Sequence, residues 1–324
     1  MTSPATAAPA VTVIVPGFNV AAYAAEALAS LRRQTLREWT ALLIDDASTD
    51  ATAAVFAEAA AADPRFRLVR HEAQAGLGAA RNTGLDLVQT PFLAFLDADD
   101  VLTPHALERL IGVLDETGSD FAIGAYVRLR PEQGGGYSVG DVQPWVAAAT
   151  APERHGTTIN EHPAATGNIV AWSKVSRTEF WHRAALRFPE GRLYEDQVVA
   201  QQMYARARRF DTVPDVIAHW RIRADGSSIT QREAHLDVLR DCLEAMDAGV
   251  HILEAGHPQA AQVRIGLILR MDVPRLAEIA RTHPDAAYRR ALGVFVRELW
   301  ARAGSARAGL DEASADIIAA ARLW

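Results

Sequence analysis

The feature that most constrains the fold is a regular alternation of short apolar runs with helix-like segments through most of the chain. The runs are bounded by polar or turn-forming residues and lie at residues 11–15, 41–44, 66–69, 92–96, 121–127 and 216–222. Such runs predict strands of a parallel sheet that is buried on both faces. Parallel neighbours need crossover helices, so we expect an α/β domain with helices on both faces of the sheet.

The segments between these runs predict the remaining elements of the domain. Thr103 followed by Pro104 predicts the start of a helix that continues to residue 114. Further helices are expected at residues 176–185 and 195–206. Residues 131–166 are rich in Gly, Pro and His and predict one long loop.

The chain changes character beyond residue 230. Residues 233–324 contain no convincing strand, and Ala, Leu, Ile and Arg recur there at spacings of three and four. Three prolines divide this part into three or four expected helices: Pro258, Pro274 and Pro284. We therefore expect two domains, an α/β domain over residues 1–230 and a helical C-terminal module over residues 231–324.

Composition excludes several classes of protein. The 324 residues are 49% hydrophobic and 23% charged, which is typical of a globular protein, and the net charge of -7 gives no general attraction for nucleic acid. Cys242 is the only cysteine, so a disulfide framework and a cysteine-based metal cluster are excluded. Residues 1–10 lack the features of a signal peptide, and no apolar run is long enough to span a membrane. A cytoplasmic location is the expectation.

Two acidic clusters directly follow two of the expected strands. They are Asp45, Asp46 and Asp50 after the second strand, and Asp97, Asp99 and Asp100 after the fourth. Ligands of open α/β sheets bind beyond the carboxyl ends of the strands, so both clusters are expected at a binding cleft. Crowded carboxylates repel each other unless a cation or hydrogen-bond donors compensate, and a hard divalent cation shared with a phosphorylated substrate would do so. Helix capping is the alternative role, and we expect it for Asp50 and Asp100.

The order of motifs resembles the family 2 glycosyltransferases, a group of inverting enzymes with a GT-A fold. The matching segments span residues 11 to about 230: 13–16 with Asn19, Gln34-Thr35, 45–50, 76–84, 97–100, 172–174, 195–197, and 221–223 before Ser227-Ser228. The resemblance implies a GT-A type, mixed and mostly parallel sheet flanked by helices. The chain departs from the usual pattern at Phe18, where Tyr is common, and at Ala47, where Gly is usual. Ala47 therefore requires either a non-positive φ or a small strain.

The resemblance also implies a nucleotide-diphosphate sugar donor, with a UDP-sugar favoured, and a bound Mn²⁺ or Mg²⁺. The expected metal ligands are Asp99 and, as an open alternative to an ordinary structural role, His219. Asp46 would accept the imino N–H of the base, and Phe18 would supply a ring face. The residues expected to bind the donor nucleotide are Pro16, Phe18, Asn19, Asp46, Arg81, Asp97, Arg221 and Arg223.

Catalysis is expected to depend on Asp196. An inverting transfer is a single displacement that needs one general base for the acceptor hydroxyl, and the resemblance implies Asp196 for this role. Glu195 is expected to assist by binding the acceptor or by orienting Asp196. The alternative is that both are ordinary acids of a first helical turn.

Several alternatives remain open after this comparison of motifs. A catalytically silent protein that binds nucleotide sugars, or a scaffold on the same fold, would share most of these residues. The acceptor is expected to be a glycan, a polymer or a lipid-linked molecule in cell-surface polysaccharide or cell-wall synthesis. The helical module is expected to form homo-oligomers or to dock the acceptor, with peripheral contact at the inner face of the membrane as the alternative.

Overall fold

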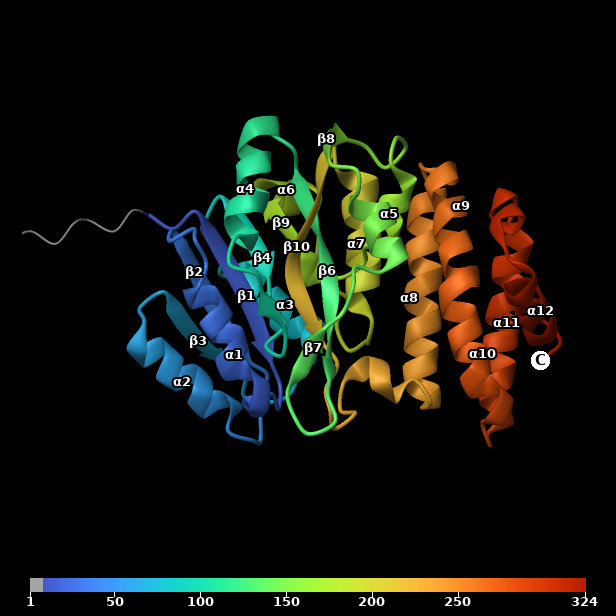
Figure 1. Cartoon of the computed structure of the whole chain (residues 1–324), viewed down its shortest axis with the longest axis horizontal. Helices are drawn as coiled ribbons and strands as arrows, with labels where there is room; N and C mark the ends of the chain where they lie inside the picture. Colours follow the sequence, from blue (N-terminus) through green and yellow to red (C-terminus); the bar gives the residue numbers. More distant parts are fainter. Residues whose placement is uncertain (1–7) are drawn as a thin grey trace, which may run out of the picture.

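The core of the protein is a ten-stranded mixed sheet, seen in a computed structural model that describes residues 8–324. Eight strands follow the order β3-β2-β1-β4-β9-β6-β10-β5, while β7 pairs with β6 and β8 pairs with β10 (Figure 1). The strands are β1 (Val11–Gly17), β2 (Trp39–Asp45), β3 (Phe66–Arg70), β4 (Phe92–Phe95), β5 (Val101–Leu102), β6 (Phe121–Pro131), β7 (Tyr137–Val139), β8 (Arg154–Thr157), β9 (Lys174–Arg177) and β10 (Phe210–Arg221).

The longest ladders of the sheet are parallel. β1 pairs in parallel with β2 and β4, β2 pairs with β3, and β6 pairs with β10. β9 lies between β4 and β6 and is antiparallel to both. This mixed α/β arrangement confirms the predicted fold class.

Helices flank the sheet, as expected for buried parallel strands. α3 lies closely against β1 at Gly84, which has no Cβ. A Cβ at this position would collide with the side chain of Ile14. The flanking helices are α1 (Ala21–Arg32), α2 (Thr52–Ala62), α3 (Leu77–Asp86), α4 (Ala106–Thr117), α5 (Pro144–Thr150), α6 (Thr178–Arg183) and α7 (Glu195–Arg206).

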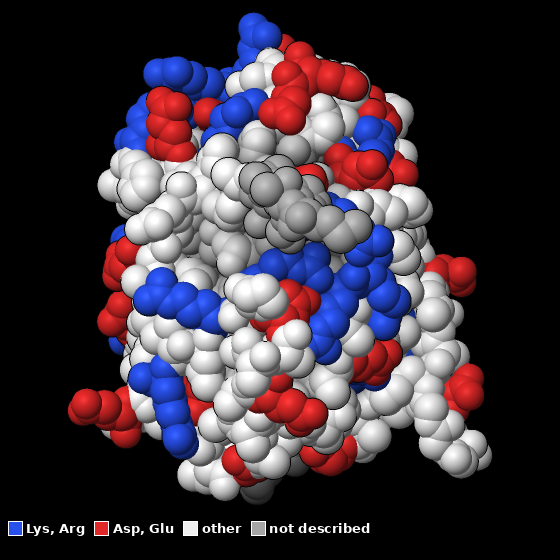
Figure 2. Space-filling view, turned by 90° about the vertical axis from the view of Figure 1, so that its left-hand side faces the viewer, with Lys and Arg blue, Asp and Glu red and all other residues white. Residues whose placement is uncertain are grey.

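The edge of the sheet at β3 carries charged side chains. Arg67 and Arg70 are exposed on this strand. Figure 2 views the molecule from this side and shows basic and acidic side chains interspersed over the face. Charges along an edge strand discourage pairing with the edge of another sheet.

The C-terminal part is helical, as predicted, and lies at the right of Figure 1. It has a buried cluster of its own that includes Leu239, Ile265, Leu276 and Leu292. The division into domains at residue 230 stays a prediction. The helices are α8 (Leu236–Glu254), α9 (Pro258–Leu267), a π-helical turn (Ile268–Asp272), α10 (Val273–Thr282), α11 (Ala286–Arg302) and α12 (Glu312–Ala321).

Three local predictions were wrong. Residues 131–166 are not one long loop, because they contain β7, α5 and β8, short elements that are held by pairing and packing with the sheet. The helix predicted at residues 176–185 is preceded by β9, and α6 covers only Thr178–Arg183. Thr103 does not cap α4, since its hydroxyl donates to the Val216 carbonyl at 2.9 Å and the helix begins at Ala106.

Within residues 8–324, every helix is too short or too polar to cross a bilayer.

Candidate active site

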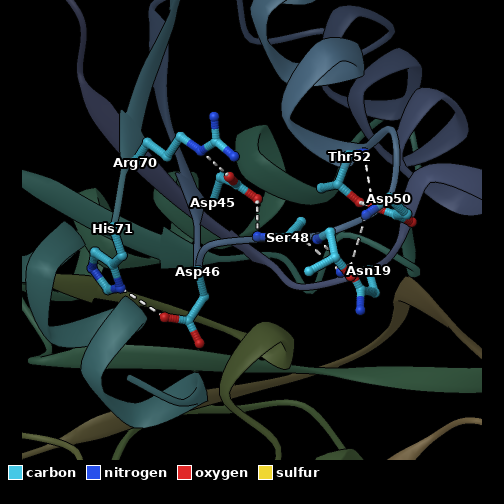
Figure 3. Close-up of polar contacts among 9 residues, drawn as sticks. Asn19, Asp45, Asp46, Ser48, Asp50, Thr52, Arg70 and His71 are labelled. Carbon is cyan, nitrogen blue, oxygen red and sulfur yellow. Dashed lines mark hydrogen bonds and ion pairs between the residues drawn. The ribbon is translucent and has the colours of Figure 1, made fainter. Parts of the chain in front are cut away.

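The loops that follow β1 and β2 are joined to each other through Asn19. Its side-chain oxygen accepts the backbone N–H groups of Thr49 at 2.9 Å and Asp50 at 3.3 Å, and its own N–H donates to Ser48 Oγ at 3.1 Å (Figure 3). Asp50 in turn accepts from the N–H of Ala21, the first residue of α1, at 3.1 Å. Asn19, a predicted nucleotide ligand, therefore uses its side-chain oxygen to fix the two loops. Asp50 has the role expected for it at the end of a helix, because it accepts the N–H of the first residue of α1.

The residues of the turn after β1 differ in how accessible they are to a nucleotide. Pro16 is buried within β1 in register with Ile44 of β2. Phe18 lies at the turn and is half-buried, so part of its ring remains accessible. Ala47 in the opposite loop has φ 58°, in the left-handed region, so the small strain foreseen for a residue other than Gly is present.

Asp46 lies at the end of β2 and is almost fully buried. Its Oδ1 lies 2.7 Å from His71 Nδ1 (Figure 3). The same oxygen accepts the N–H of Ala75 at 2.8 Å, and Oδ2 accepts the N–H of Gly76 at 2.8 Å. These contacts fix the loop that leads into α3. A carboxylate oxygen has two lone pairs, and Oδ2 has one described partner, so the predicted bond to a base N–H stays a prediction.

Arg81 connects the two halves of the site. From α3, its guanidinium forms one ion pair with Asp97 at 2.6 Å and a second, short one with Glu195 at the start of α7. The side chain is 2% exposed, and both neighbouring carboxylates raise its pKa against the opposing effect of burial. Arg81, predicted to bind the donor nucleotide, thus holds two protein carboxylates through its terminal nitrogens, while its buried Nε has no described partner.

Asp99 and Asp100 lie beside two arginines from the end of β10. Asp99 Oδ2 accepts from Arg223 Nε at 2.8 Å, and Asp100 Oδ1 accepts the N–H of Arg221 at 2.7 Å. Arg221 is buried, and its guanidinium donates to the Asp99 carbonyl at 2.8 Å and to Glu26 at 2.6 Å. Arg221 is therefore a structural link, whereas Arg223 pairs directly with Asp99. Asp100 does not cap a helix, contrary to prediction.

The neighbouring arginines do not fully compensate the negative charge of the carboxylates in this cluster. Burial, and then the neighbouring Asp97, raise the pKa of Asp99 against the opposing effect of Arg223. The pKa of Asp100 is raised strongly by burial and by Asp99 and Asp97. Asp97 retains 25% exposure of its side chain. A hard cation with oxygen ligands fits this donor set, since it would supply the missing charge.

The role of His219 as a metal ligand stays a prediction. It lies in β10 in register with Val101 of β5 and Val127 of β6, and burial lowers its pKa. Among residues 8–324, no three or more His, Cys, Asp or Glu side chains gather in an arrangement that could hold a metal ion. Any metal held by Asp99 would consequently take its other ligands from substrate and water.

Asp196 is a carboxylate of the site with no described hydrogen bond to another side chain. It lies in the first turn of α7, half-buried, beside a small cavity that it lines together with Lys174, Phe188 and Met203. Burial raises the pKa of Asp196, Arg81 and Lys174 lower it, and Asp97 raises it. An available carboxylate with a raised pKa can act as a general base.

Lys174 lies in one of the segments that match the family, and it is buried. Its Nζ donates to the carbonyls of Asn168 at 3.0 Å and Val170 at 2.7 Å and to Asn168 Oδ1 at 2.7 Å. Burial lowers the pKa of Lys174 to about 7. Trp172 packs edge-to-face on Tyr126, with ring centroids 4.9 Å apart, and belongs to the core.

Asn82 is a site residue that sequence reasoning missed. Its side chain donates to the carbonyl of Phe188 at 2.9 Å and accepts the N–H of the same residue at 3.0 Å, so it fixes the segment before α7. The signal was its place directly after Arg81 in a motif of the family. Nothing in that motif indicated a partner more than 100 positions away.

Comparisons with known proteins agree with this geometry. Residues 12–141 match the sequence model described as glycosyl transferase family 2. The chain is 31% identical over 228 residues to EpsH of Bacillus subtilis, covering 69% of this chain and 63% of EpsH. It is 28% identical over 235 residues to the glycosyltransferase GlyA of Streptococcus pneumoniae, covering 72% of this chain and 33% of GlyA. The chain thus spans less than two thirds of the length of either relative.

The fold is shared with a solved structure. The crystal structure of residues 1–349 of TarS from S. aureus in complex with UDP-GlcNAc superimposes with a TM-score of 0.73 at 21% identity, covering 89% of this chain and 81% of that one. The match over residues 12–141 and the shared fold confirm the resemblance to glycosyl transferase family 2 and the predicted GT-A fold.

Proposed function

We propose that the protein is an inverting glycosyltransferase that moves a sugar from a nucleotide-diphosphate donor to an acceptor hydroxyl. The observation that carries this proposal is Asp196, a half-buried carboxylate at the helix start with a raised pKa and no side-chain hydrogen-bond partner. Three neighbouring carboxylates form ion pairs: Glu195 and Asp97 with Arg81, and Asp99 with Arg223. Asp196 has no such partner and is available to accept a proton.

In the proposed reaction Asp196 takes the proton of the acceptor hydroxyl while that oxygen attacks the anomeric carbon. The bond to the nucleoside diphosphate breaks on the opposite face of the sugar, so a single displacement inverts the configuration. Arg81 keeps Asp97 and Glu195 in place on either side of the reacting centre. Arg223 would leave Asp99 for the diphosphate of the donor, as a charge-assisted hydrogen-bond donor.

Mn²⁺ or Mg²⁺ fits the cluster at the end of β4. Asp99 would hold the ion, and Asp97 would bind the ribose or bind the ion through water. The ion would supply Lewis-acid stabilisation to the leaving diphosphate. The raised pKa of Asp99 supports this assignment, because it marks a buried carboxylate that lacks a sufficient positive partner.

A UDP-sugar is the proposed donor. The accessible ring of Phe18 and the carboxylate of Asp46 lie at the ends of neighbouring strands, where a uracil ring would stack and hydrogen-bond. The solved TarS structure with the shared fold contains UDP-GlcNAc, which supports the same nucleotide here. The proposed acceptor is a glycan, polymer or lipid-linked molecule of the cell surface.

The competing hypothesis is a silent protein that binds nucleotide sugars without transferring them. Thermal unfolding with UDP, GDP, UDP-glucose and UDP-GlcNAc, in Mn²⁺ or in chelator, separates the alternatives when combined with release of UDP. Stabilisation by UDP that is lost on chelation, together with slow UDP release from one of the sugars, supports the transferase. Stabilisation without any release, even with a panel of sugar acceptors, supports the silent protein.

A further inference from the structure

The helical module reaches the segment that carries Asp196 at several points. Residues 191–194 precede α7 and lie next to α8 and the turn before it. Asp241 of α8 accepts the N–H of Leu193 at 3.0 Å with one oxygen and pairs with Arg192 at 3.0 Å through the other. A carboxylate of the C-terminal module therefore binds the backbone two residues before the acidic pair of the site begins.

A second contact is made by Tyr194, the residue immediately before Glu195. Its hydroxyl donates to Glu233 Oε1 at 3.0 Å, and its ring packs against the buried cluster of the helical module. The other oxygen of Glu233 forms a short ion pair with Arg275 of α10, and the Glu233 carbonyl accepts from the Tyr288 hydroxyl of α11 at 2.8 Å. Two helices of the module, α10 and α11, thus hold the residue that binds Tyr194.

A third contact follows Asp196 directly. The side-chain oxygen of Gln197 accepts from Arg264 of α9 at 2.9 Å, and both side chains are buried. Asp196 is therefore bracketed along the chain by residues that the module holds. On the other side, Glu195 is held by Arg81, so the acidic pair lies between α3 and the module.

The backbone at this point needs such support. Tyr194 has φ 59° and ψ 29°, a left-handed conformation that a residue with a large side chain rarely adopts. Strained residues of this kind persist only where their surroundings fix them, and they cluster at functional sites. The turn at Tyr194 sets the direction in which α7 begins, and so the direction of the Asp196 side chain.

We propose that the helical C-terminal module acts as a positioning clamp for the general base, with Asp241, Glu233 and Arg264 as its positioning residues. This inference rests on the proposed function of Asp196. It goes beyond the oligomerisation and acceptor docking expected for the module, because the module would be needed for turnover within a single protomer. Loosening one anchor would misdirect Asp196 while the donor cleft at β1, β2 and β4 stays intact.

The test compares two aspartates of α8. Asp241 pairs with Arg192 of the catalytic segment, whereas Asp247 pairs with Arg302 of α11 at 2.5 Å, within the module. Asp241→Ala and Asp247→Ala each remove one arginine-paired carboxylate from the same helix. Asp241→Asn keeps one oxygen that can accept the Leu193 N–H and serves as the conservative variant.

The first measurement is hydrogen exchange of the backbone amides of residues 191–198 in the full-length protein. We expect exchange in this segment to be at least tenfold faster in Asp241→Ala than in the unmodified protein. Asp247→Ala should leave it unchanged, and Asp241→Asn should restore most of the protection. Equal exchange in the two alanine variants would overturn the inference, whatever the enzyme does.

Kinetics then test whether the clamp serves catalysis. With UDP-glucose or UDP-GlcNAc, Asp241→Ala should lower kcat about tenfold to a hundredfold, since small misplacements of a reacting group have effects of that size. KM for the donor should stay within about twofold. Partial unfolding would also lower the apparent kcat at constant KM, so the folded fraction is measured by circular dichroism at the assay temperature. A fall in kcat no larger than the unfolded fraction would contradict positioning. If Asp196→Asn itself turns over normally, the proposed base fails, while the exchange result still reports on the clamp.

Discussion

Replacing Arg81 should destabilise the protein strongly, because the side chain compensates two carboxylates in a dry site. Arg81 is 2% exposed and pairs with Glu195, also 2% exposed, and with Asp97. Arg81→Met keeps an unbranched apolar stem and removes the guanidinium, whose carbon lies over the Phe188 ring at 5.2 Å from the ring centroid. Removing one partner of a buried ion pair costs about 3–5 kcal/mol, since an uncompensated charge stays behind.

The effect should depend on pH in a defined direction. The pKa of Glu195 is raised to about 7 by burial, with Arg81 acting to lower it. A folded-state pKa above the unfolded value means that this carboxyl contributes stability at low pH, and that the contribution is lost as the pH rises through about 7. Without Arg81 the pKa of Glu195 rises further, so Arg81→Met should be more damaging at pH 8 than at pH 5.

Thermal unfolding at pH 5 and pH 8 measures both effects. For a domain of this size, about 3–5 kcal/mol corresponds to a fall of roughly 6–20 °C in Tm. Adding Glu195→Gln to Arg81→Met should recover part of the loss at pH 8, since it removes one of the two stranded charges. If Arg81→Met alone melts within about 2 °C of the unmodified protein at pH 8, Arg81 does not compensate the two carboxylates as described.

Three further outcomes are expected. Gly84→Ala should cost about 1–3 kcal/mol, because a Cβ there collides with Ile14 in the core, and urea unfolding measures the difference. Gly112→Ala in α4 has open space around it and should stabilise by about 0.4–1 kcal/mol, so a loss at both glycines would contradict the packing argument. The pKa of Lys174, lowered to about 7, means that its contribution to stability rises with pH above about 7, so Lys174→Met should flatten the pH dependence of Tm between pH 7 and 10. An unchanged slope would show that Lys174 is charged in the fold.

Sequence patterns predicted the parallel half of the sheet well and the antiparallel strand poorly. β1, β2 and β4 are apolar runs that stand out from their surroundings, because both faces of each strand are covered. β9 is the four-residue sequence Lys174–Arg177, and it is a strand only because it fits between β4 and β6. No local pattern in such a short polar segment distinguishes it from the start of a helix.

At the candidate site, the sequence predicted which residues take part but not which of them pair with one another. Motifs identified Arg81, Asp97 and Glu195 as site residues, and the structure does bring them together. Their pairing with one another could not be predicted, because Arg81 and Glu195 are 114 positions apart and each has several plausible partners. The roles assigned to Asn19 and Asp46 missed their backbone partners, which no side-chain pattern reveals.

The anchors of the helical module had no sequence signal at all. Glu233 and Asp241 look like ordinary acids of an exposed helical region, and their contacts with Tyr194 and Leu193 depend on how the module packs against α7. The module lies outside the motifs of the family, so neither resemblance nor periodicity could assign it a part in the chemistry.

The most direct test of the account is the effect of Asp196→Asn on binding and turnover measured in the same preparation. Calorimetric titration with UDP in Mn²⁺ should give an affinity within about twofold of the unmodified protein, since Asp196 makes no described contact in the nucleotide cleft. Release of UDP from the preferred UDP-sugar should fall by about 10²–10⁴-fold, the contribution expected of a general base. Turnover near the level of the unmodified protein would contradict the central claim that Asp196 takes the proton of the acceptor.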